Sequence, residues 1–207
     1  TRGSMFTLQM KFGLSGTTVT EHVKFGRRIL VQILKDDDDA KVKIPSPPKI
    51  AEYNQAVENR HSALKNVWMT MDGLKLCSEQ SPDCTVQSRF YNGWTHDHHV
   101  TNIFGFCPAG TIVVACTDVP GCIHDSMVCE WGNIYNQLQK VCNETGGTCT
   151  VDSAFSGKKC DFLIKSSQSL PDTAEGITVN QDAASMRQSA EWGMRSFQSS
   201  FPGIKDL

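Results

Sequence analysis

The sequence predicts an α/β protein, in which helices flank a mixed sheet and a small helical segment precedes them. Apolar, β-branched runs such as TIVVACTDV alternate with stretches of helical periodicity, as expected when helices cover a sheet. With 207 residues, of which 39% are hydrophobic, the chain can bury one sizeable core. A run of four aspartates followed by three prolines interrupts the pattern, and this composition is typical of a solvated linker.

The first part of the chain, residues 1–35, is expected to form a helical, helix-turn-helix-like segment, because its apolar residues recur near helical spacing. Lys24, Arg27 and Arg28 are candidate DNA contacts if this helix enters a groove. The alternative is an ordinary amphipathic helix packed on the main domain. Residues 36–48 are the predicted acidic and proline-rich linker, whose self-repelling aspartates lack the fixed geometry that a catalytic metal site requires.

Residues 49–207 are expected to form the main domain. The pattern predicts, in order, a helix over 49–65, a strand ending at Asp72, a hairpin of strands 100–107 and 111–119, a helix over 124–142, a strand ending at Asp152, a strand over 162–167, a loop over 168–178 and a helix over 179–200. Carboxylates close two of the strands, and a third projects from the last helix. This order is that of an RNase H-like fold.

Three acidic residues stand out by their local setting. Asp72 and Asp152 each close an apolar, β-branched run, and Glu191 lies in the last predicted helix. Hard oxygen ligands on rigid elements suit Mg²⁺ or Mn²⁺, the ions of two-metal phosphoryl transfer. The plain alternative is that both aspartates are turn residues and that Glu191 lies on a solvated helix face.

Further candidates lie beside these acids. His124 and Asp125 open the predicted helix, where Asp125 is either a fourth acidic ligand or, with Ser126, a capping residue. Arg187 stands one helical turn before the glutamate and is placed to orient that carboxylate or to hold a phosphate. The alternative for Arg187 is a surface ion pair, which contributes little stability.

The nine cysteines form an odd count without any CxxC pair. This pattern argues against a disulfide framework and a structural zinc site, and it predicts free thiols in a reducing intracellular compartment. Three histidines lie in GWTHDHH, residues 93–99, but neighbours on an extended chain point in different directions, which favours contact with DNA phosphate over a metal site. No apolar run is long enough to cross a bilayer, so no membrane contact is expected. A net charge of −2 provides no overall attraction to nucleic acid.

Five strings in the last two thirds of the chain carry a resemblance to a known family. They are MDGLKL, RFYNGWTHDHHVTNIFGF, VPGCIHDSMVCEWG, TVDSAF and RQSAEWGMRSFQSSFPGIKD, of which Pro-Gly-x-x-His-Asp-Ser is the most family-specific part. Over about residues 66–207 the chain resembles Harbinger/PIF-type DDE transposases, the DDE superfamily endonucleases. The resemblance implies a metal-dependent DNA endonuclease and strand-transferase with a two-metal mechanism, in which Asp72, Asp152 and Glu191 are the catalytic and metal-binding triad.

The resemblance also implies DNA as the substrate, Mg²⁺ or Mn²⁺ as the cofactor, the nucleus as the location, and a separate partner protein with its own DNA-binding domain. It leaves a homo-oligomer open. Because the first residue is Thr and the sequence stops soon after Lys205, we expect both the helical segment and the nuclease domain to be truncated. Two alternatives remain: a decayed or domesticated relative that binds DNA or protein without cleaving, and a zinc-binding module built from Cys and His residues.

Overall fold

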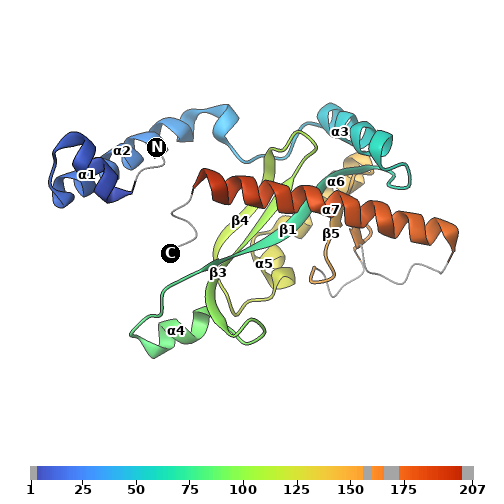
Figure 1. The fold of residues 1–207 in the computed structure, drawn as a ribbon. Helices are drawn as coiled ribbons and strands as arrows, with labels where there is room; N and C mark the ends of the chain where they lie inside the picture. Colours follow the sequence, from blue (N-terminus) through green and yellow to red (C-terminus); the bar gives the residue numbers. More distant parts are fainter. Residues whose placement is uncertain (1–3, 156–159, 166–172, 202–207) are drawn as a thin grey trace. The chain divides into compact units, whose positions relative to one another are not determined.

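The structure, a computed structural model, describes residues 4–155, 160–165 and 173–201. The chain forms two compact units, Thr1–Val42 and Lys43–Leu207. In the first unit, α1 (Met5–Phe12) and α2 (Gly16–Asp36) are joined by a short turn and followed by a 3-10 helix, η1 (Asp38–Ala40) (Figure 1). Ser4 and Ser15 cap the two helices, because each side chain accepts a hydrogen bond from a backbone N–H of the first turn.

The described residues of the second unit form a six-stranded mixed sheet. Its strands are β1 (Val67–Cys77), β2 (Tyr91–Asn92), β3 (Asp97–Phe106), β4 (Ile112–Pro120), β5 (Thr148–Val151) and β6 (Leu163–Lys165). The spatial order is β2-β3-β1-β5-β6, and β4 also pairs with β3. The central strand β1 is antiparallel to β3 and parallel to β5. Parallel strands need a long crossover, which the intervening helices provide.

Helices cover both faces of this sheet, with α7 in front and α5 behind in Figure 1. The helices of the second unit are α3 (Pro47–Arg60), α4 (Cys84–Phe90), α5 (Asp125–Trp131), α6 (Ile134–Thr145) and α7 (Ala174–Ser200). Ala190 and Met194 of α7 pack on Leu74 of β1, whereas α5 and α6 pack in a separate cluster around Met71. This arrangement confirms the predicted fold, an RNase H-like mixed sheet flanked by helices with a small N-terminal helical segment.

The two packing clusters show which way each side chain of β1 points. Met71 belongs to the cluster with α5 and α6, and Leu74 belongs to the cluster with α7. Successive side chains of a strand point to opposite faces, so Asp72 lies on the α7 face and Gly73 faces α5. The carboxylate of Asp72 is therefore held under α7 by the same alternation that builds the core.

Two predicted element boundaries are wrong near the site. β1 continues for five residues beyond Asp72, so this aspartate lies within the strand rather than at its end. The predicted helix over 124–142 is two helices, α5 and α6. The interruption comes at Gly132 and Asn133, where Asn133 adopts the left-handed conformation with φ of 56°. That conformation cannot continue a right-handed helix.

The start of the last helix also differs from the prediction. α7 begins at Ala174 rather than at residue 179, because Thr173 Oγ1 accepts a hydrogen bond from Gly176 N–H at 3.2 Å and caps the helix. The predicted strand over 162–167 is seen as β6 in its described part, while much of the predicted loop over 168–178 lies outside the described residues. α4 was not predicted from the sequence, whereas α1 lies within the helical segment predicted over residues 1–35.

Candidate active site

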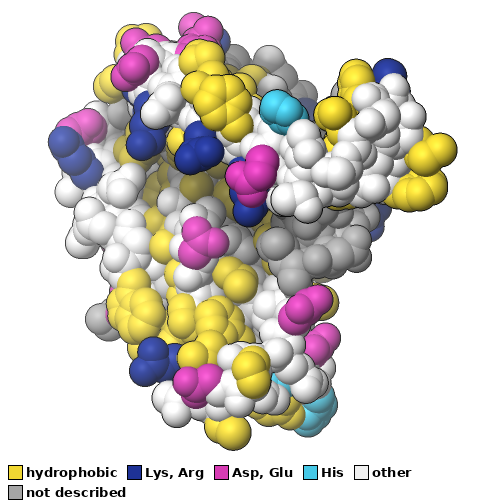
Figure 2. All heavy atoms as spheres, turned by 90° about the vertical axis from the view of Figure 1, so that its left-hand side faces the viewer, with side chains coloured by type: hydrophobic (Ala, Val, Ile, Leu, Met, Phe, Trp, Pro, Cys, Tyr) yellow, Lys and Arg dark blue, Asp and Glu magenta, His cyan; other side chains and the backbone are white. Residues whose placement is uncertain are grey.

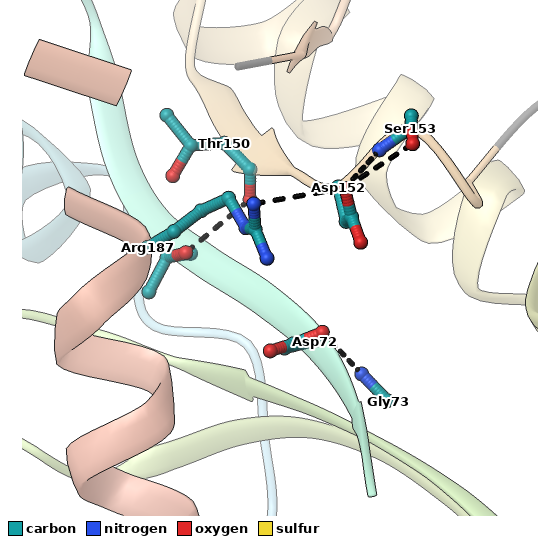
Figure 3. A network of polar contacts seen from close by, with 7 residues as sticks. Asp72, Gly73, Thr150, Asp152, Ser153 and Arg187 are labelled. Atoms are coloured by element: carbon teal, nitrogen blue, oxygen red, sulfur yellow. Dashed lines mark hydrogen bonds and ion pairs between the residues drawn. The ribbon is translucent and has the colours of Figure 1, made fainter. Parts of the chain in front are cut away.

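Asp72 and Asp152 are brought together by the pairing of β1 with β5. The two strands are parallel neighbours, and Thr70 is aligned with Thr150. Asp72 and Asp152 each stand two residues further along, so the two carboxylates lie at the same level beside α7 (Figure 3). Thr70 Oγ1 also donates a hydrogen bond to the Thr150 carbonyl at 3.4 Å. Strands that are far apart in the sequence thus place two acids side by side.

Short hydrogen bonds orient both carboxylates. Asp72 Oδ1 accepts a bond from Gly73 N–H at 2.8 Å. Asp152 Oδ1 accepts bonds from Ser153 N–H at 2.6 Å and from the Ser153 hydroxyl at 3.3 Å. In each case the partner is the following residue, so the orientation is part of the local backbone geometry. The second oxygen of each carboxylate, Oδ2, lies outside these bonds.

The surroundings of Asp72 make its charge unfavourable. Burial raises the pKa of Asp72, the bond from Gly73 and the charge of Arg187 lower it, and the negative charges of Asp152 and Asp125 raise it again. The net effect is a pKa above the usual value. Carboxylates gathered in a partly buried place repel one another unless a cation compensates. The site therefore favours a positive charge beside Asp72.

A third carboxylate, that of Asp125, approaches from the other layer. Asp125 is the first residue of α5, and its Oδ2 lies 3.0 Å from the position that a Cβ on Gly73 would occupy. Burial raises the pKa of Asp125, the charges of Lys75 and His124 lower it, and Asp152 raises it further. These couplings make Asp125 an electrostatic part of the acidic site.

The structure does not show the capping role considered for Asp125 and Ser126. The residue before α5 is His124, and its side chain makes no capping hydrogen bond. Instead His124 Nδ1 lies 3.1 Å from Ser126 Oγ. Lys75, which sequence reasoning missed, shares the face of Gly73 because the two positions are two residues apart in β1. In a strand, the glycine and the lysine of MDGLKL, Gly73 and Lys75, point to the same face. This alternation could have predicted a basic residue on the face that Asp125 approaches.

Glu191 is not gathered with the two aspartates into a metal-binding group among the described residues. Its side chain is 49% exposed, and its Oε2 pairs with Arg195 at 4.0 Å. In the described part of the chain, no hydrogen bond or ion pair joins Glu191 to Asp72 or Asp152. The residue lies on α7 four positions after Arg187, so the two side chains share one side of the helix.

Arg187 is the α7 side chain that reaches the acids. Its Nη1 lies 3.6 Å from Asp152 Oδ1, and its charge also lowers the pKa of Asp72. Figure 3 shows the side chain extending from α7 toward Asp152, with Asp72 close by. The suggestion that Arg187 orients Glu191 has no counterpart here, because the ion-pair partner of Glu191 is Arg195.

The donor chemistry of this site suits a divalent cation, although the side chains are not arranged around one. Within the ranges that the structure describes, no group of three or more His, Cys, Asp or Glu side chains is placed to hold a metal ion. Asp72 and Asp152 nevertheless present hard carboxylate oxygens from adjacent rigid strands, which is what Mg²⁺ and Mn²⁺ require. In the structure, the guanidinium of Arg187 lies beside Asp152.

Comparison with known proteins decides the family. A family model described as DDE superfamily endonuclease matches residues 71–206, about two thirds of the chain. The chain belongs to the DDE superfamily endonucleases. The matched range contains Asp72, Asp152, the whole of α5 and the whole of α7. Neither the curated proteins nor the solved structures yield a significant match.

The remaining predicted features of this DDE superfamily endonuclease fall outside the acidic site. Lys24, Arg27 and Arg28 are exposed on α2, in the other unit. None of the nine cysteines is placed in a disulfide among the described residues, and three of them are buried. No helix among the described residues is both long and apolar enough to cross a bilayer. These findings leave the acids beside α7 as the candidate active site.

Two of the three histidines of GWTHDHH are buried, whereas His96 is exposed. His98 and His99 are buried, and the Tyr91 ring packs on His98 with ring centroids 5.3 Å apart. His99 Nε2 lies 3.1 Å from Thr95 Oγ1, and burial lowers the pKa of His99. The described residues therefore provide no zinc-binding cluster here.

Replacing Asp72 by Asn is expected to stabilise the metal-free protein at pH 7 by about 1 kcal/mol, since it removes an unfavourable charge and keeps the shape. The raised pKa of Asp72 sets the sign. Above that pKa the ionised acid destabilises the folded state. As the pH falls toward about 4, the value for an unperturbed aspartate, the acid takes up a proton and the difference vanishes. Urea unfolding with chelator at both pH values measures this. A variant less stable than wild type at pH 7 would contradict it.

Proposed function

We propose that the chain is a transposase-derived DNA endonuclease and strand-transferase of the Harbinger/PIF type, which cuts phosphodiester bonds with divalent metal held by Asp72, Asp152 and Glu191. One observation supports the proposal: Asp72 of β1 and Asp152, directly after β5, each stand two residues beyond the paired Thr70 and Thr150, and local hydrogen bonds orient both carboxylates. Bound there, Mg²⁺ or Mn²⁺ ions supply an activated water and neutralise charge on the leaving oxygen.

The residues of the chain have separate parts in this proposal. Gly73 and Ser153 hold the two carboxylates through their backbone N–H groups, so the oxygens need little reorganisation to bind a cation. Asp152 directly follows the last residue of β5, and its side chain is 37% exposed. Asp125 adds negative charge from the α5 side and strengthens the attraction for a cation.

Glu191 can join the pair at little cost. Its ion pair with Arg195 spans 4.0 Å, and the two side chains are 49% and 75% exposed. Exposed ion pairs of this kind contribute at most about 1 kcal/mol. Glu191 lies on the same side of α7 as Arg187. Its side chain therefore completes the ligand set by a change of rotamer when a cation is present.

The wider setting follows from this function. The chain is organised as a helical segment over 1–35, a linker over 36–48 and the nuclease domain over 49–207, and the division after Val42 supports a boundary inside that linker. Figure 2 shows Lys and Arg side chains interspersed with Asp and Glu on the face it draws, and the net charge is −2. A separate DNA-binding partner would supply the affinity for DNA that such a surface lacks. The free thiols support a reducing location, here the nucleus.

A nicking assay tests the proposed function. Purified protein and supercoiled DNA are incubated with Mg²⁺, with Mn²⁺ or with chelator, and nicked circles are quantified. We expect nicking that depends on the metal. A protein that binds Mn²⁺ through Asp152 without nicking would instead be the decayed or domesticated relative. A protein that binds no divalent ion at this site would refute the metal-dependent assignment.

Glu191 and Asp125 are distinguished by parallel substitutions. Glu191→Gln should lower metal-dependent nicking by about 100-fold or more, the scale on which one charged group of an active site contributes. Asp125→Asn should lower it by only about 10-fold, because Asp125 acts from the other face through its charge. Circular dichroism confirms that both variants fold. The reverse ranking would make Asp125 the third ligand and would remove Glu191 from the site.

A further inference from the structure

Arg187 occupies the place beside the acids where a cation is needed. Its Nη1 lies 3.6 Å from Asp152 Oδ1, and its charge acts on Asp72 as well. The arginine side chain is 23% exposed, so the guanidinium is largely enclosed by the site rather than free in solvent. A delocalised, permanently charged group of this kind neutralises carboxylates without being titrated near neutral pH.

The packing of α7 keeps this side chain in place. Ala183, Met186, Ala190 and Met194 are buried against the sheet, so the helix has one rotation that fits. Gly193 fixes its distance as well, since a Cβ at this position would meet the ring of Phe106 at 2.6 Å. The backbone of Arg187 is therefore held, and only its long side chain can move.

On each face of the sheet, a basic side chain acts on the acids of the site. On the α5 side, the charge of Lys75 lowers the pKa of Asp125. On the α7 side, Arg187 pairs with Asp152 and acts on Asp72. The negative charge on each face is thus partly neutralised by a basic residue of the protein, Lys75 on one face and Arg187 on the other. A divalent cation and the guanidinium cannot share one side of Asp152, because like charges at that separation repel strongly.

We propose that Arg187 is a built-in counter-ion that competes with divalent metal for Asp72 and Asp152, so that metal enters only when the guanidinium swings away. The inference rests on the proposed function, because it assigns a regulation to the same site. It has a physical consequence: the metal-free protein is stabilised by Arg187, and its affinity for metal is lowered by the same contact. A residue that merely orients Asp152 for metal would have the opposite effect on affinity.

The test measures Mn²⁺ binding by calorimetry and by thermal shift, without DNA and without reference to activity. The variants are Arg187→Gln, which removes the charge, and Arg187→Lys, which retains it. Asp152→Asn provides the baseline for binding elsewhere. We expect Arg187→Gln to melt at a lower temperature than wild type without metal. We expect it to bind Mn²⁺ about 10-fold more tightly, because the substitution removes a positive charge that repels the cation beside Asp152. Arg187→Lys should stay close to wild type.

The possible results separate the two levels of the argument. If wild type binds Mn²⁺ above the Asp152→Asn baseline and Arg187→Gln binds it equally or more weakly, the counter-ion role is refuted while the metal site stands. If Arg187→Gln and Arg187→Lys bind Mn²⁺ equally tightly, and both more tightly than wild type, competition by charge is also refuted. If none of the proteins exceeds the baseline, the proposed function fails and the counter-ion role fails with it.

Discussion

Asp152→Asn is expected to lower Mg²⁺- or Mn²⁺-dependent DNA cleavage by about 1,000-fold or more, the scale seen when a central group of an active site is removed. Asp152 stands at the end of β5 level with Asp72, and Asn keeps its size and its ability to accept from Ser153 N–H. The substitution removes the negative charge that a divalent cation requires. Cleavage of supercoiled DNA at several metal concentrations measures the loss.

The matched control is Glu144→Gln, which makes the same chemical change at an exposed acid. Glu144 pairs with Lys140 at 3.9 Å on α6, away from the acidic site. Its cleavage rate should equal that of wild type. Both variants should melt within a few degrees of wild type in chelator, so that lost activity cannot be due to unfolding. Cleavage by Asp152→Asn at even a tenth of the wild-type rate would show that Asp152 is not a metal ligand.

Gly121→Ala is expected to destabilise the fold by about 3 kcal/mol, near the upper end for a forced overpacking. A Cβ at Gly121 would meet the His99 carbonyl oxygen at 2.3 Å and the Phe90 carbonyl oxygen at 2.8 Å. Both atoms belong to the backbone, so neither can rotate away. For a chain of this size the melting temperature should fall by about 6–12 °C. Thermal unfolding followed by circular dichroism measures the change.

Gly93→Ala is the control for this substitution, since a Cβ at Gly93 would meet nothing within 4 Å. Its stability should stay within about 0.5 kcal/mol of wild type. Equal melting temperatures for the two variants would contradict this prediction, because they would show that the backbone around Gly121 shifts to accept a Cβ at little cost. The expected result explains the glycine of Pro-Gly-x-x-His-Asp-Ser by close packing of the backbone ahead of α5.

Much of the fold could be predicted from local patterns. The runs that end in MDGLKL and TVDSAF indicate β1 and β5, and the periodicity before Glu191 indicates α7. The break between α5 and α6 was predictable in principle, because Gly132-Asn133 is a common helix-ending pair. The start of α4 likewise carries a local signal, since Asp83 accepts bonds from two backbone N–H groups of its first turn.

The side-chain partners in the site could not be predicted in the same way. Arg187 and Glu191 share one side of α7, so which of them lies beside Asp152 depends on the position of the helix along its own axis. The packing of buried residues such as Ala183 and Ala190 determines that position. The approach of Asp125 to Gly73 depends on how α5 packs on β1, many residues away in sequence. Sequence spacing therefore identified the acids, while tertiary packing determines which of them meet and which base compensates them.

Anomalous X-ray scattering from crystals grown with Mn²⁺ tests the metal assignment most directly. The expected result is a strong manganese peak bonded to carboxylate oxygens of both Asp72 and Asp152, at roughly the 2.0–2.1 Å that small divalent ions of the Mg²⁺ type require. The Arg187 guanidinium should be displaced from Asp152 in the same crystals. A structure in saturating Mn²⁺ with no peak between these two aspartates, or with the ion held only by other residues, would contradict the proposed active site.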